Sequence, residues 1–187
     1  ASLGNHAHAN GISLELYGKG YVLGPDAGIG KNLYSGLDYS EYYSQMPAHN
    51  TVVVDGVSSY PVMMSQHAFK VVASSPEVSA EQPASKKLSE QKEKMTYATV
   101  SFIEPETQAE QQRTTAIVKT CYKGGYYIDV FRSRKKEGGD KTHDYFYHNL
   151  GQEMKVMDAS NGNPLDMKPT EELAFAGGHL YAYSYIS

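Results

Sequence analysis

Residues 113–132 read RTTAIVKTCYKGGYYIDVFR, and this stretch decides the fold class. Two runs rich in β-branched and aromatic residues, 113–122 and 126–132, flank the tripeptide Lys123-Gly124-Gly125. Such side chains favour strands, and a short glycine-containing connection between two strands favours a hairpin turn. The segment therefore predicts two neighbouring antiparallel strands.

The same pattern continues on both sides of this hairpin. Residues 12–17 (ISLELY) alternate with period two, and Gly18-Lys19-Gly20 turns the chain into a return strand at 21–23. Many short strands separated by turns are typical of an antiparallel β-sandwich, so we expect one all-β domain over residues 1–187. Further strands are predicted at 51–56, 68–73, 77–81, 97–102, 144–150 and 180–186, a tyrosine-rich ordered loop at 28–47, and a charged surface segment at 82–94.

Composition excludes several classes of function. The chain has 187 residues with 17 basic and 21 acidic side chains, a formal net charge of −4. That balance offers no basic surface for nucleic acid. No apolar run approaches the roughly 20 residues that cross a bilayer, so we expect no membrane span. The single cysteine, Cys121, excludes an internal disulfide.

A small set of histidines and one aspartate points to a metal. His6 and His8 stand two positions apart, which places both imidazoles on one face of an extended strand. The predicted hairpin returns Asp26 toward them, and His49 opens the next strand. Two imidazole nitrogens and a carboxylate suit zinc, although the spacing leaves open whether His6 or His8 supplies the first nitrogen. The alternative is that these histidines cap loops or form hydrogen bonds in the core.

Three blocks of sequence carry a family resemblance. Residues 5–17 (NHAHANGISLELY), 20–28 (GYVLGPDAG) and 48–56 (AHNTVVVDG) resemble the heparinase II/III-like polysaccharide lyases. The order of His-x-His, hairpin, Asp-x-Gly, tyrosine-bearing loop and His-Asn-Thr-Val is the shared signature. A weaker similarity follows at 126–129 and 143–148.

The resemblance implies a supersandwich-like domain that normally follows a helical toroid, which is absent from this chain. Such enzymes cleave uronic-acid polysaccharides, including glycosaminoglycans and alginate, by β-elimination, and work in the periplasm or after secretion. The family's main catalytic Tyr, His and Asn usually lie in the toroid. We therefore expect this chain alone to be inactive.

The resemblance also implies roles for individual residues. His8, Asp26 and His49 would hold a mainly structural zinc ion, and His6 would face the cleft for substrate contact or proton transfer. Asn10 stands where the family often has aspartate. A catalytic tyrosine would come from the loop before His49: Tyr34 and Tyr43 are the candidates, with Tyr39 and Tyr42 in reserve.

Two other functions fit parts of the pattern. A cupin-like metal-dependent oxygenase also places His-x-His on a strand ahead of a distant histidine. It usually has a glutamate a few residues after the second histidine, whereas Glu15 follows His8 by seven positions. A non-catalytic carbohydrate-binding module would instead present some of the 16 tyrosines as an exposed platform.

Overall fold

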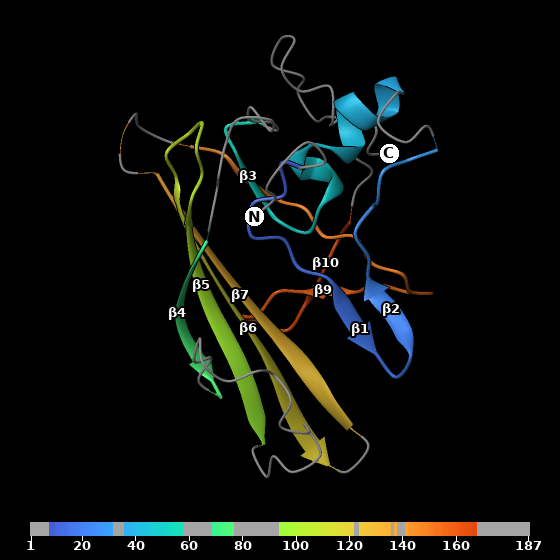
Figure 1. Cartoon of the computed structure of the whole chain (residues 1–187). Helices are drawn as coiled ribbons and strands as arrows, with labels where there is room; N and C mark the ends of the chain where they lie inside the picture. Colours follow the sequence, from blue (N-terminus) through green and yellow to red (C-terminus); the bar gives the residue numbers. More distant parts are fainter. Residues whose placement is uncertain are drawn as a thin grey trace.

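The structure is a computed structural model that describes residues 8–31, 36–57, 69–76, 94–121, 124–135, 137 and 141–167. Its sheets are antiparallel, and its helical segments are single turns. A four-stranded sheet forms one layer, and shorter strands with the helical turns lie against its upper part (Figure 1). The predicted all-β sandwich is confirmed.

The four-stranded sheet has the order β4-β5-β6-β7. Its strands are β4 (Lys70–Ser75), β5 (Met95–Ile103), β6 (Glu110–Cys121) and β7 (Gly124–Arg134). The predicted hairpin is β6–β7, but the expected turn was placed too late, because Gly124 already pairs with Cys121. Gly125 lies so close to β6 that a Cβ there would be 2.5 Å from the carbonyl oxygen of Val118. Glycine at this position reflects close backbone approach inside the strand.

The opposing layer contains two strand pairs. β1 (Leu16–Gly18) pairs with β2 (Tyr21–Gly24), and β3 (Val52–Val54) pairs with β8 (His143–Tyr145). β1 and β8 are shorter than the sequence predicted. The intervening backbone instead makes isolated hydrogen bonds: Leu14 N–H donates to Asn50, and Leu150 N–H donates to Leu23. These bonds hold the segments in place without extending a ladder.

Where the structure describes it, the tyrosine-rich stretch between β2 and β3 is irregular apart from two helical turns, as expected. A π-helical turn, η1, spans Tyr39–Tyr43, and a 3₁₀ turn, η2, spans Met46–Ala48. A peripheral hairpin, β9 (Val156–Met157) with β10 (Pro164–Leu165), ends the described chain. The predicted strands at 77–81 and 180–186, and the charged segment 82–94 apart from Lys94, lie outside the described residues.

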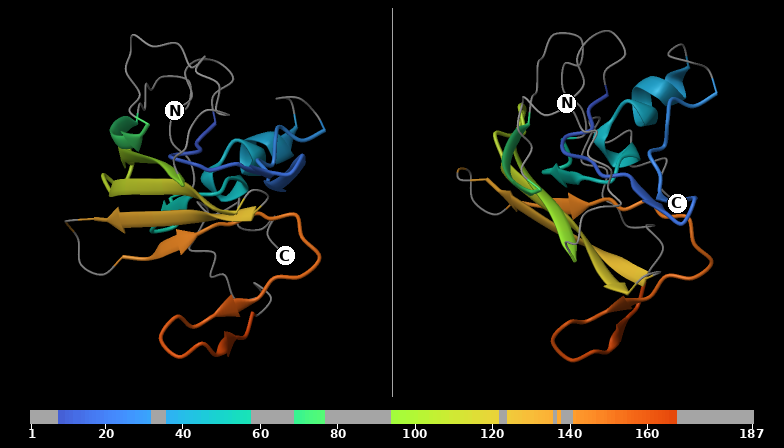
Figure 2. Two further views of the ribbon diagram at one scale, coloured as in Figure 1. Left: turned by 90° about the horizontal axis from the view of Figure 1, so that it is seen from below. Right: turned by 60° about the horizontal axis from the view of Figure 1, so that its bottom comes forward.

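The core forms around β3, whose three valines are all buried. Val52 and Val54 pack with Ala109 and with the partly buried Phe131 of β7. Val53 points the other way, toward Ala9 and Met46. β3 therefore lies between the four-stranded sheet and the irregular segments that precede it, an arrangement visible in both views of Figure 2.

One arginine crosses between the layers. Arg113 of β6 is 2% exposed, and its guanidinium donates two hydrogen bonds to the Asp129 carboxylate, at 2.8 and 2.7 Å. Nη1 donates to the carbonyl oxygens of Ile12 and Asn50 in the opposing layer. The guanidinium also lies 5.3 Å from the centroid of the Phe131 ring. A planar, bidentate donor of this kind fixes both layers at once.

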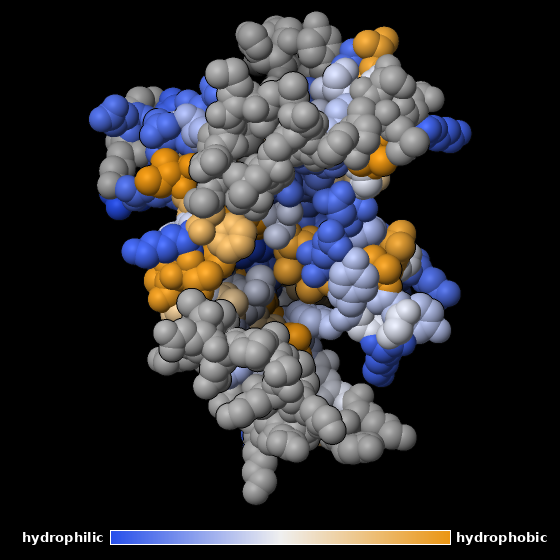
Figure 3. All heavy atoms as spheres, in the orientation of Figure 1, coloured by the Kyte–Doolittle hydropathy of each residue, from blue (hydrophilic) through white to orange (hydrophobic). Residues whose placement is uncertain are grey.

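Apolar side chains also remain on the surface. On the face shown in Figure 3, hydrophobic residues are interspersed with hydrophilic ones. The exposed apolar residues of the four-stranded sheet include Val71, Val72, Ile117, Ile128 and Val130.

We expect Arg113→Gln to lower the free energy of unfolding by about 3 kcal/mol, because Asp129 loses its cationic partner and two backbone carbonyls lose their donor. Urea denaturation of the chain measures this change. Lys155→Gln is the control: Lys155 and Glu153 form an ion pair with 71% and 69% exposed side chains, and its loss should cost below about 1 kcal/mol. Equal losses for the two variants would contradict a special role for Arg113.

Candidate metal centre

Three segments without regular strand structure supply the candidate ligands. His8 lies in the irregular chain before β1, where Ala9 N–H donates to Ser44 at 2.8 Å. Asp26 follows β2 in a turn closed by the hydrogen bond from Gly28 N–H to its Oδ1, at 2.8 Å. His49 follows η2 and donates its N–H to Met46 at 3.0 Å. A hydrogen bond at or next to each ligand residue therefore holds its segment in place.

These three side chains, here called the triad, come together. One potential ligand atom from each of His8, Asp26 and His49 lies within 4.8 Å of the other two. His49 Nδ1 is 2.6 Å from Asp26 Oδ2, and the two imidazole centroids are 5.3 Å apart. His49 is 1% exposed and Asp26 27%. The spacing of the sequence left two histidines possible, and the structure places His8 in this cluster.

The local environment favours metal-binding protonation states. Burial lowers the pKa of the His8 imidazole, and His49 lowers it further, against an opposing contribution from Asp26. Burial alone would raise the pKa of the Asp26 carboxyl. The hydrogen bonds from His49 and Gly28 and the neighbouring imidazoles outweigh burial and bring it below its usual value. A neutral imidazole and an ionised carboxylate are the forms that bind a metal ion.

An unsatisfied atom tests whether a metal would fit. His49 Nε2 is buried and has no hydrogen-bond partner in the described part of the chain. A buried polar atom without a partner is costly, and metal coordination is one way to satisfy an imidazole cluster of this kind. Two nitrogens and one carboxylate oxygen are also a common donor set for zinc. The triad residues therefore fit a divalent metal ion.

Aromatic residues of η1 lie beside the triad. The ring of Tyr39 makes an edge contact with His8, with centroids 5.6 Å apart. Tyr42 and Tyr43 contact each other at 5.3 Å, and burial together with this neighbour raises the pKa of Tyr42. The Tyr43 ring packs so closely on Gly30 that a Cβ there would lie 2.6 Å from Tyr43 Cε2. Tyr43 is therefore held against the turn that carries Asp26.

The other two expected catalytic residues, His6 and Tyr34, lie outside the described residues. Of the loop tyrosines held in reserve, Tyr39 contacts a triad member. Sequence reasoning did not single it out, because an irregular loop gives no period from which to predict where a side chain points. The only sequence signal for the contact of Tyr39 with His8 was its position in the tyrosine-rich stretch before His49.

Two polar residues around the triad have roles that the sequence did not predict. His148 follows β8 and lies beside η2, with Nε2 2.8 Å from the carbonyl oxygen of Pro47. Arg113 joins the segments of Ile12 and Asn50, as described above. Arg113 stands in the polar run QQRTT at residues 111–115, so no local sequence pattern marks it as buried.

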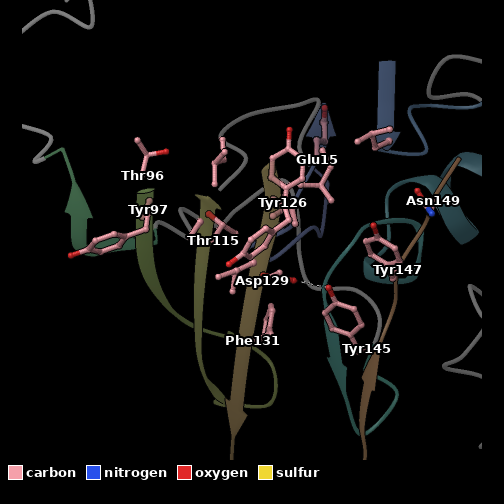
Figure 4. Close-up of a pocket in the computed structure, with 18 of the residues that line it drawn as sticks. Glu15, Thr96, Tyr97, Thr115, Tyr126, Asp129, Phe131, Tyr145, Tyr147 and Asn149 are labelled. Atoms are coloured by element: carbon pink, nitrogen blue, oxygen red, sulfur yellow. Dashed lines mark hydrogen bonds between the residues drawn. The ribbon is translucent and has the colours of Figure 1, made fainter. Parts of the chain in front are cut away.

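A cleft of about 1520 Å³ is lined by residues of β5, β6 and β7 on one side and of β1 and β8 on the other (Figure 4). The rings of Tyr145 and Tyr147 stack at 6.4 Å along one side. Burial and the hydrogen bond to Asp129 raise the pKa of Tyr145 well above its ordinary value, so its hydroxyl stays protonated. None of the triad residues lines this cleft. This cleft and the metal cluster are separate features.

Comparisons with known proteins agree with the structure. The family described as "Heparinase II/III-like, C-terminal" matches residues 1–126. The chain is also 33% identical over 175 residues to a protein of Formosa agariphila named "Endo-acting ulvan lyase". The match covers 88% of this chain and 20% of that protein, so the chain spans about a fifth of its relative's length.

The described helices are too short and too polar to cross a membrane. The antiparallel sandwich, the His-Asp-His cluster and the match over residues 1–126 are consistent with one another. The chain belongs to the heparinase II/III-like family, as a part of its C-terminal region.

Proposed function

We propose that this chain is the zinc-binding β-sandwich part of a polysaccharide lyase that cleaves a uronic-acid polysaccharide by β-elimination. The observation that carries the proposal is the convergence of His8, Asp26 and His49 in a member of this family. The protein named as an ulvan lyase makes ulvan the first acidic polysaccharide to test, ahead of heparan sulfate and alginate. We place the complete enzyme to which this chain belongs in the periplasm or outside the cell.

His8, Asp26 and His49 are the residues that would hold zinc. When bound, the ion would supply a cross-link between segments that lie 18 and 23 residues apart in the chain. Asp26 opens the turn on which the Tyr43 ring packs, and His8 contacts Tyr39. The ion would thereby fix the loop that carries the tyrosines, which is a structural role.

The reaction needs a base for the C5 proton of the uronate and an acid for the glycosidic oxygen. The C5 proton becomes acidic only when hydrogen-bond donors neutralise the adjoining carboxylate. Histidine and tyrosine can serve as base and acid, but a basic tyrosine requires nearby donors or cations, since its ordinary pKa is about 10. His6, Tyr34 and Tyr43 are the residues we propose for these steps.

Other catalytic groups would come from a helical toroid elsewhere in the complete enzyme. The chain corresponds to about a fifth of its relative's length. We therefore expect this chain alone to release no unsaturated product from ulvan, heparan sulfate or alginate. Ultraviolet absorbance of the new C4–C5 double bond measures it, with the complete enzyme as the positive control. Product from the chain alone would overturn the placement of these groups, and no product from the complete enzyme would overturn the lyase assignment.

The metal proposal predicts one zinc ion per chain, lost on Asp26→Asn. This substitution keeps the shape of the side chain and removes the charge that attracts the cation. Asp55→Asn is a matched control, since the two aspartates have 27% and 28% exposed side chains and Asp55 pairs with Lys135 and Lys141 instead. Titration calorimetry and elemental analysis measure the stoichiometry. Undiminished binding by Asp26→Asn would remove Asp26 from the ligand set.

Zinc should also stabilise the fold. A ligand that binds only the folded chain, at about a hundred times its Kd, raises the free energy of unfolding by about 2.7 kcal/mol. Thermal denaturation with zinc, and after removal of zinc by a chelator, measures this difference. The shift should appear in the wild type and in Asp55→Asn, and be absent from Asp26→Asn. A chelator effect of equal size in all three proteins would contradict stabilisation through the triad.

Among the described tyrosines we propose Tyr43 as the catalytic one. In the complete enzyme, Tyr43→Phe should lower kcat by about 10²- to 10⁴-fold, the usual contribution of a general acid or base. Parallel variants Tyr34→Phe and His6→Ala test the other two positions. Tyr21→Phe, in the exposed β1–β2 hairpin, is the control, since Tyr21 is 72% exposed. A Tyr43→Phe enzyme with wild-type kcat would exclude this role.

A further inference from the structure

We propose that the Asn50 side chain is a positioning residue that holds the Asp26 and His49 segments in the geometry the metal requires. The inference rests on the proposed metal binding and assigns a role to a residue that is not itself a ligand. Asn50 directly follows His49 and is 1% exposed. Its contacts reach the segments of all three triad residues.

The carboxamide of Asn50 joins three backbone segments. Nδ2 donates to the carbonyl oxygen of Leu14 at 2.9 Å and to that of Pro25 at 3.3 Å. Oδ1 accepts a hydrogen bond from the backbone N–H of His148. Carbonyl oxygens can only accept and an N–H can only donate, so these partners fix which end of the amide is which.

Two of the partners of Asn50 lie close in sequence to triad residues, so the network can orient the ligands. Pro25 immediately precedes Asp26, so the Nδ2 contact at that carbonyl fixes where the carboxylate segment leaves β2. Leu14 lies on the segment that begins with His8, and its own N–H donates to the carbonyl oxygen of Asn50 at 3.2 Å. One buried side chain thereby links the His49 segment to the other two.

Two neighbouring contacts reinforce the same arrangement. Arg113 Nη1 donates to the backbone carbonyls of Asn50 and Ile12, which joins the His49 and His8 segments a second time. The backbone N–H of His148 donates a hydrogen bond to the Asn50 side chain. The His148 ring in turn contacts the carbonyl oxygen of Pro47, two positions before His49. Asn50 is therefore the centre of a continuous network around the triad, and the dry surroundings make each of its bonds costly to lose.

A role in stability alone would predict a different result from a role in positioning. Any buried amide contributes to folding, but only one that orients ligand segments changes metal affinity in protein that remains folded. Residues that orient metal ligands typically contribute about 10- to 100-fold to affinity. Metal affinity and the geometry of the bound ion are therefore the decisive measurements.

The chain offers a matched control in Gln111. Gln111 is 2% exposed, and its Nε2 donates to the carbonyl oxygen of Val52 at 3.2 Å, in the regular strand β3. Its side-chain hydrogen bonds, to Val52 and Ser133, do not reach the segments of His8 or Asp26. Gln111→Ala removes a buried amide of the same chemistry. It should alter stability without altering metal affinity.

The experiment compares wild type, Asn50→Ala, Asn50→Ser and Gln111→Ala as full chains. Zinc affinity is measured by competition with a chromophoric chelator, the fold by circular dichroism, and the ion's geometry by the visible absorption of bound Co²⁺. We expect Asn50→Ala to lose about 10- to 100-fold in zinc affinity. Asn50→Ser, whose hydroxyl can replace one donor, should lie between Asn50→Ala and the wild type. The Co²⁺ spectrum should change in the Asn50 variants and stay unchanged in Gln111→Ala.

The possible failures are distinct. If the wild type binds no zinc, the proposed metal function is wrong, and the positioning role is wrong with it. If the wild type binds zinc and folded Asn50→Ala binds it equally well with the same Co²⁺ spectrum, only the positioning inference is overturned. Should Asn50→Ala fail to fold, Asn50→Ser decides by the same two readouts. A loss of affinity in Gln111→Ala equal to that in the Asn50 variants would also overturn the inference.

Discussion

The guanidinium of Arg113 lies between the two layers of the sandwich, where it is almost fully removed from water. Its charge is balanced by Asp129 on the adjacent strand, and its remaining donors reach backbone carbonyls of Ile12 and Asn50 in the opposing layer. A buried cation tolerates little displacement of its partners, because each lost hydrogen bond leaves desolvated charge. The four-stranded sheet therefore sets the position of the irregular segments that carry the triad. The regular strands provide the scaffold, and the irregular segments provide the chemistry.

The parts of the fold that were predictable are those where side-chain pattern and backbone hydrogen bonding agree. β6 and β7 are rich in β-branched and aromatic residues and pair over a long ladder, and the predicted hairpin is present. The strand expected at 12–17 is present only as Leu16–Gly18, because the backbone N–H of Leu14 donates to Asn50 and not to a paired strand. Hydrogen bonds to residues far away in the sequence can replace the pairing of two strands in this way, and they cannot be predicted from the local sequence.

The candidate site shows the same division. The residue pattern predicted that Asp26 and His49 would meet a third ligand from His6 or His8, and the family resemblance implied His8. The structure brings His8, Asp26 and His49 together. The residues that hold those segments were not predictable as such. Asparagine is a common turn-capping residue, so the sequence alone does not mark Asn50 as special. Its burial and its hydrogen bonds to Leu14 and Pro25 show that it links distant segments. A carboxamide acts through partners far away in sequence, which spacing alone cannot reveal.

A metal ion at the triad would stabilise segments that have few other cross-links. The triad segments lack long strands, and the single cysteine of the sequence excludes a disulfide between them. Hydrogen bonds from Asn50 and Arg113 orient the segments, but they leave His49 Nε2 buried without a partner among the described residues. Ligands 18 and 23 residues apart would close two loops around one ion. Such closure restricts the unfolded chain as a cross-link does, and it satisfies the imidazole cluster in the folded one. The polar network and the proposed ion are therefore complementary: the network arranges the ligands, and the ion would satisfy the buried His49 nitrogen.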